Sequence, residues 1–112
     1  MKNKPIVTQI MEEAVDVSQR VFGDALRQVW LYGSCARGDS DEDSDIDFMV
    51  VLSEPIETWK MLDTVYCDFS INILNRYGEL PSVLITDINK FNSGQGQLYK
   101  NVKEEGVLYY GK

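Results

Sequence analysis

Hydrophobic and polar residues alternate along the first part of the chain with the spacing of a helix. Between Ile6 and Phe22 the apolar positions are Val7, Ile10, Met11, Ala14, Val17 and Val21. Residues three and four apart lie on the same side of a helix, so these side chains would form one apolar stripe. Gly23, which follows, is a typical C-terminal stop. The pattern predicts an amphipathic helix over residues 6–22.

Three later runs have the composition of β-strands. Gln28–Tyr32 (QVWLY) and Ile46–Leu52 (IDFMVVL) are rich in the β-branched and aromatic residues that buried strands favour. Tyr66–Leu74 (YCDFSINIL) alternates, which would place Phe69 on one face of a strand and Asp68 on the other. The sequence thus predicts three strands.

The remaining segments give weaker signals. Ser53 is a suitable cap for a short helix, and Ser93 for a last helix that reaches Val102 and stops near Gly106. The final VLYY has strand composition. Residues 76–93 fit neither pattern, and we assign no element to them.

Charge is concentrated in one place. The chain has 112 residues and a net charge of -7, from 11 basic and 18 acidic side chains. Six of the acids lie between Asp39 and Asp47, and without them the balance is 11 against 12, or -1. A nearly neutral remainder lacks the basic surface that binding along a nucleic acid requires. The absence of histidine excludes imidazole bases, Ser-His triads and His-ligated zinc.

Length and hydropathy predict one domain spanning residues 1–112. No apolar run approaches the length of a membrane span, and the N-terminal segment carries acids where a signal peptide is apolar. We therefore expect a cytoplasmic protein. Cys35 and Cys67 form no CxxC pair, and in that setting we expect packing residues rather than a disulfide.

The acidic segment is not a calcium loop. Asp39, Asp41 and Asp43 give D-x-D-x-D, but an EF-hand also needs glycine at its sixth position and glutamate at its twelfth. Those positions hold Ser44 and Val50.

Asp45 and Asp47 suit a different metal. They stand two apart at the head of a predicted strand, so both carboxylates would project from one face while Ile46 and Phe48 point into the core. Mg²⁺ takes a few protein oxygens and completes its shell with water and substrate phosphates. This pair therefore predicts a magnesium site.

Gly33 and Ser34 end the preceding predicted strand. Gly33 and Gly38 have the spacing of a P-loop, but the lysine position holds Asp39, which would repel phosphate, and this excludes a P-loop. Glycine still lets the backbone approach a phosphate closely, and the next N–H groups would open a short helix aimed at it. One loop is thus expected to bind phosphate and the next to bind metal.

Together these residues resemble a known signature. GSCARG from Gly33 to Gly38, followed by SDID from Ser44 to Asp47, is similar to the motif of the minimal nucleotidyltransferases, members of the DNA polymerase β-like superfamily. The resemblance covers residues 6–74 well and the last third loosely. It implies a small α/β (α+β) domain of the polymerase β palm type, with a mixed sheet and helices packed mainly on one face.

The resemblance also implies a chemistry. A nucleoside monophosphate would pass from an NTP, with ATP expected, to a hydroxyl acceptor, and pyrophosphate would leave. Two Mg²⁺ ions would be held by Asp45, Asp47 and a third carboxylate from a later strand, for which Asp68 is the matching position. Asp68 would also accept the proton of the acceptor. Gly33 and Ser34 would hold the phosphates.

Two assignments stay open at this point. Arg37 is either a triphosphate ligand or an ion-pair partner of the acidic loop. Ser34 can cap the following helix as well as contact phosphate. The acids of residues 39–43 are expected to be solvated rather than to bind metal.

Two functions from different classes fit the sequence. The first is an enzyme that acts on a small molecule or on a helical partner protein, the latter as the antitoxin of a toxin–antitoxin pair. The second is a binding module that neutralises such a partner by contact, with little or no catalysis. A full set of three carboxylates favours the enzyme, because a contact module does not need one. Oligomeric state and nucleotide preference are not determined by the sequence.

Overall fold

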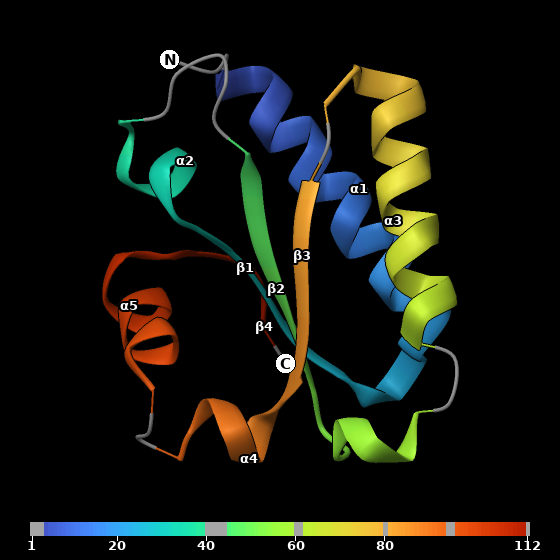
Figure 1. The fold of residues 1–112 in the computed structure, drawn as a ribbon, viewed down its shortest axis with the longest axis vertical. Helices are drawn as coiled ribbons and strands as arrows, with labels where there is room; N and C mark the ends of the chain where they lie inside the picture. Colours follow the sequence, from blue (N-terminus) through green and yellow to red (C-terminus); the bar gives the residue numbers. More distant parts are fainter. Residues whose placement is uncertain (1–3, 40–44, 60–61, 80, 94–95, 112) are drawn as a thin grey trace.

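A four-stranded mixed sheet forms the centre of the computed structural model, which describes residues 4–39, 45–59, 62–79, 81–93 and 96–111 (Figure 1). The strands are β1 (Leu26–Tyr32), β2 (Ile46–Leu52), β3 (Pro81–Asp87) and β4 (Val107–Gly111). Their order is β3-β2-β1-β4; β1 is antiparallel to β2 and β4, whereas β2 and β3 run parallel. The predicted mixed sheet is confirmed.

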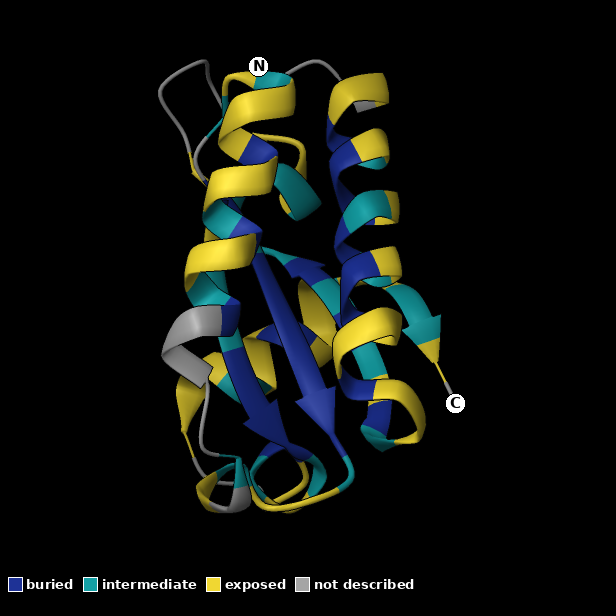
Figure 2. Cartoon of the chain, turned by 90° about the vertical axis from the view of Figure 1, so that its right-hand side faces the viewer, coloured by how far each residue is buried: buried dark blue, intermediate teal, exposed yellow. Residues whose placement is uncertain are grey.

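The two long helices, α1 (Lys4–Phe22) and α3 (Leu62–Tyr77), cover one face of the sheet. Burial follows the predicted stripe of α1 at Val7, Ile10, Met11, Ala14 and Val17, whereas its last predicted member, Val21, is exposed. Figure 2 shows the buried positions gathered on the strands and on the sheet-facing sides of both helices. The main core lies between these layers.

Two shorter helices, α4 (Ile88–Phe91) and α5 (Gln97–Glu105), cover part of the opposite face. A second, smaller apolar cluster forms there around Met49, Val51 and Phe91. The sheet therefore carries a core on each face, with the larger one under α1 and α3. In the described part of the chain, no helix is long and apolar enough to cross a membrane.

The strand predicted over residues 66–74 is wrong, because this run belongs to α3. Val65, Phe69 and Ile73 are buried at a spacing of four, which is one face of a helix, whereas Cys67 is exposed and is not a packing residue. Topology gives the reason. Parallel neighbours such as β2 and β3 need a crossover connection, which is usually a helix.

Smaller differences concern the short elements. The helix expected from Ser53 is one 3-10 turn, η2 (Ile56–Thr58), and a similar turn, η1 (Gly23–Ala25), joins α1 to β1. The backbone N–H of Ser53 donates to the carbonyl of Ala25 instead of opening a helix. The last helix begins after Gly96 rather than at Ser93.

Candidate nucleotide and metal site

The candidate site lies where β1 ends and β2 begins. Gly33 alone separates β1 from the one-turn helix α2 (Ser34–Arg37), and Tyr32 pairs with Asp47 across the two antiparallel strands. This pairing brings the Gly33-Ser34 motif beside the Asp45-Ile46-Asp47 motif. The two halves of the sequence signature thus meet in space.

The backbone of Gly33 lies against the carboxylate of Asp47. Gly33 has φ 74° and ψ -156°, a combination that essentially only glycine adopts. A Cβ placed on it would overlap Oδ2 of Asp47 and lie 3.3 Å from Cγ. Both the backbone conformation and the space require glycine here.

Asp45 directly precedes β2 and is exposed, and Asp47 is the second residue of this strand and is partly buried. As predicted, Ile46 and Phe48 point the other way and are fully buried. Burial raises the pKa of the Asp47 carboxyl, and the negative charge of Asp45 raises it further. Hydrogen bonding from the side chain of Ser82 opposes this rise. A cation between the two acids would relieve their repulsion.

Helix α2 is tied to both motifs. The backbone N–H groups of Ala36 and Arg37 each donate to the carbonyl of Gly33 at 3.1 Å. The Cys35 thiol lies 3.6 Å from the carbonyl oxygen of Asp45, to which it donates. These contacts confirm the short helix expected after Gly33 and hold its start beside Asp45.

Arg37 lies between two acids. Its Nε is 3.2 Å from Oδ2 of Asp39, and its Nη1 is 3.7 Å from Oε2 of Glu105 at the end of α5. The ion-pair assignment is therefore correct, and a contact with phosphate stays a prediction. Such exposed pairs contribute little to stability, so they can open at little cost. The remaining acids of the loop, within residues 40–44, lie outside the described residues.

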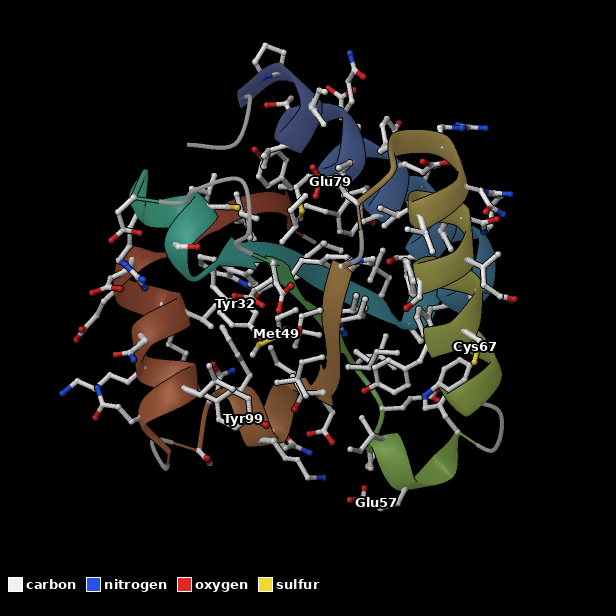
Figure 3. All side chains as sticks on the ribbon, turned by 45° about the horizontal axis from the view of Figure 1, so that its top comes forward. Tyr32, Met49, Glu57, Cys67, Glu79 and Tyr99 are labelled. Carbon is white, nitrogen blue, oxygen red and sulfur yellow. The ribbon has the colours of Figure 1, made fainter. Side chains whose placement is uncertain are left out.

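Asp68 is not brought to the site. It is exposed on α3, and its neighbour Phe69 packs on Phe48, on the face of the sheet opposite to Asp47. Figure 3 shows Cys67, which precedes Asp68, on α3 and apart from Tyr32. Among the described residues no three acids or cysteines form a group that could hold a metal. The position expected for the third carboxylate was wrong because the strand was wrong.

Two side chains that the sequence did not indicate flank Asp47. Tyr32 on β1 and Ser82 on β3 are its register partners on either side. Burial and the nearby charge of Asp47 raise the pKa of Tyr32 to about 12, so its phenol stays protonated at neutral pH. Ser82 could not be found because no strand was predicted around it; Tyr32 could have been, as the residue directly before Gly33.

These residues fit one Mg²⁺ ion rather than two. One exposed and one partly buried carboxylate leave most of the coordination shell to water and phosphate oxygens, as Mg²⁺ prefers. A second ion beside the first would need a further carboxylate, and the described residues place none there.

The chain belongs to the family described as Polymerase beta, Nucleotidyltransferase, which matches residues 12–112. Two relatives from Methanocaldococcus jannaschii, MJ0604 and MJ0141, are provisionally named protein adenylyltransferases. MJ0604 is 27% identical over 101 residues, which cover 89% of this chain and 94% of the relative. MJ0141 is 36% identical over 83 residues, which cover 74% of this chain and 77% of the relative.

Solved structures share the fold. A provisionally named minimal nucleotidyltransferase superposes with a TM-score of 0.58 at 22% identity, over 95% of both chains. A toxin–antitoxin structure with AMP-PNP gives 0.58 at 17% identity, over 99% of this chain and 75% of the other. The structure of a tri-AMPylated HEPN toxin in complex with MNT antitoxin, from Shewanella oneidensis, superposes with a TM-score of 0.55 at 13% identity. The match covers 95% of this chain and 73% of the other. The polymerase β-like nucleotidyltransferase fold is confirmed.

Replacing Gly33 tests its contact with Asp47. Gly33→Ala should lower the free energy of unfolding by roughly 1–3 kcal/mol through backbone strain and should weaken Mg²⁺-dependent ATP binding, because the new Cβ displaces the Asp47 carboxylate. Gly23→Ala is the matched control, since Gly23 also has a positive φ, 54°, but open space around it. Chemical denaturation and calorimetric titration measure the two effects. Equal ATP affinity in both variants would place the phosphate site elsewhere.

Replacing Asp47 tests the metal site. In wild type, Mg²⁺ with AMP-PNP at 100 times its Kd should stabilise the fold by about 2.7 kcal/mol. Asp47→Asn should lose most of this gain, yet be at least as stable as wild type without metal, because the repulsion from Asp45 is removed. Asp68→Asn removes the same charge from an exposed position and should behave as wild type. Thermal unfolding with and without ligand gives the answer, and full Mg²⁺-dependent stabilisation in Asp47→Asn would disprove the assignment.

The raised pKa of Asp47 gives a pH dependence of definite sign. The folded-state value lies above the ordinary 3.8, so between the two values the folded protein binds more protons than the unfolded chain. The contribution of Asp47 to metal-free stability should therefore decrease as pH rises through this interval. Mg²⁺-dependent stabilisation should fade as pH falls, since proton and metal compete. Both effects are measured as the difference in the free energy of unfolding between wild type and Asp47→Asn, followed from acid to neutral pH with and without Mg²⁺. A difference that changes with pH in the opposite direction would contradict them.

Proposed function

We propose that this chain transfers the AMP group of ATP to a hydroxyl group of a partner protein, as the antitoxin of a toxin–antitoxin pair. The observation that carries the proposal is the carboxylate of Asp47, held against Gly33 beside Asp45. The provisional names of the two relatives support a protein acceptor. The AMP-PNP of one structural neighbour and the AMPylated toxin of another support ATP and a toxin partner.

Each side chain of the site then has a task. Asp45 and Asp47 would hold Mg²⁺ together with the triphosphate; the ion, when bound, neutralises charge on the phosphate oxygens. The amides that open α2 at Ser34, with the bare backbone of Gly33, would contact the phosphates. Arg37 would exchange its exposed acidic partners for phosphate oxygens.

The transfer itself exchanges one bond for another. The acceptor oxygen bonds to the α-phosphorus, the bond from that phosphorus to the β-phosphate oxygen breaks, and pyrophosphate leaves. The acceptor hydroxyl must also lose its proton. The chain has no histidine, Tyr32 stays protonated and Asp68 lies elsewhere. Asp45 and Asp47 are the carboxylates of the candidate site itself, and they would receive the proton, directly or through water.

A specific observation also favours the second candidate, a module that neutralises its partner by contact. The three-carboxylate set that would argue for an efficient enzyme is not formed by the described residues. Under this alternative, Mg²⁺ and ATP would bind without transfer.

The two candidates separate in one experiment. The purified chain is incubated with Mg²⁺, a lysate of its source cells and ATP labelled on the α-phosphate, and parallel reactions use γ-labelled ATP. An AMP-transferring enzyme should label a protein from the α-label only. Asp47→Asn should reduce the labelling at least about 100-fold, and Asp68→Asn, the matched loss of one charge, should not.

The outcomes exclude one candidate each. Labelling from α-labelled ATP that depends on Asp47 rules out a purely contact-based role. Absence of labelling from any of the four NTPs, with a partner that Asp47→Asn still neutralises, rules out the enzyme. Labelling by GTP, CTP or UTP in preference to ATP would change the proposed nucleotide substrate and leave the proposed transfer reaction unchanged.

A further inference from the structure

One row of side chains crosses the sheet at the level of the candidate site. Tyr32 on β1, Asp47 on β2 and Ser82 on β3 are register partners and face the same side. The next row toward the other end, Trp30, Met49 and Leu84, belongs to the apolar cluster of that face. Figure 3 shows Tyr32 and Met49 close together over the sheet. The row of Asp47 is thus the boundary between the apolar cluster and the site.

The β3 member of this row decides how many carboxylates the site contains. Adjacent strands lie about 4.8 Å apart, and a carboxylate beside Asp47 on β3 could share two ions spaced about 3.5–4 Å. The chain places Ser82 there, a neutral hydroxyl that is exposed and hydrogen-bonds to Asp47. On the other side Tyr32 offers only a phenol, which carries no negative charge at neutral pH. Neither neighbour supplies a second negative ligand.

No other described acid fills this role. Asp68 lies on the opposite face of the sheet, and Glu105 is paired with Arg37. Glu79 precedes β3 and is partly buried, but with Asp45 and Asp47 it forms no metal-binding group. Its position makes it the rival to be tested.

We infer that the chain binds a single Mg²⁺ ion at Asp45 and Asp47, and that Ser82 is the residue that withholds the ligand for a second ion. This inference rests on the proposed function in one respect only, namely that the site binds a nucleotide. As a consequence, the acceptor hydroxyl would be activated without a second ion. Transfer would then be slow unless the partner protein supplies the missing activating group. The position also predicts a gain: Ser82→Asp should create the missing ligand.

The test counts metal ions. Mn²⁺ prefers the same oxygen ligands as Mg²⁺ and is visible by electron paramagnetic resonance. The wild-type complex with AMP-PNP should contain one Mn²⁺ per chain, with the spectrum of an isolated ion. Ser82→Asp should contain two, with the spin coupling of neighbouring ions, and should bind the second at least about tenfold more tightly than wild type. Ser82→Asn is the control of matched size without charge and should contain one.

Each result supports or overturns the inference. Two coupled ions in wild type would overturn it, and their loss in Glu79→Gln would identify the ligand instead. No bound ion in wild type would also overturn it. A folded Ser82→Asp that still binds one ion would refute the role of Ser82, and the wild-type count decides the first half even if that variant does not fold. Because the count needs no acceptor, one ion in wild type alongside absent AMP transfer would refute the proposed function and leave this inference standing.

Discussion

The site depends on one close approach, that of the Gly33 backbone to the Asp47 carboxylate. The contact is possible because residue 33 has no side chain and adopts a φ of 74°. Gly33 lies between the end of β1 and the start of α2, and it fixes where the chain turns relative to β2. A residue with a Cβ would have to move either the turn or the carboxylate. The two halves of the sequence signature, Gly33-Ser34 and Asp45-Ile46-Asp47, are therefore one structural unit.

The fold holds these acids in a state that is unfavourable without a cation. Asp47 is partly buried and repelled by Asp45, and both effects raise its pKa. The pair stays in place because Ile46 and Phe48, which alternate with the acids on the same strand, are anchored in the core beneath α1 and α3. Core packing on one face thus keeps repelling charges together on the other. A bound cation would recover part of that cost.

Local sequence patterns predicted most of this arrangement. They failed for one segment, whose state depends on how distant strands pair. The helix over residues 6–22, the strand Ile46–Leu52 and the turn at Gly33 are each specified by their own residues. The run over residues 66–74 is ambiguous because Phe69 and Ile73 are four apart, a spacing that suits one face of a strand and one face of a helix. Its helical state follows from the crossover to β3, which the sequence did not reveal.

That single error changed the chemistry that was expected. With a strand at residues 66–74, Asp68 completes a set of three carboxylates, and an efficient enzyme follows. With a helix there, the strand beside β2 is Pro81–Asp87, and its residue next to Asp47 is Ser82. The signature of Gly33, Asp45 and Asp47 predicted the family, which the comparison confirms, and it gives the place where we expect a nucleotide to bind. If the site holds a single ion, the reactivity of that nucleotide would depend on Ser82, which lies on a strand that the signature does not include.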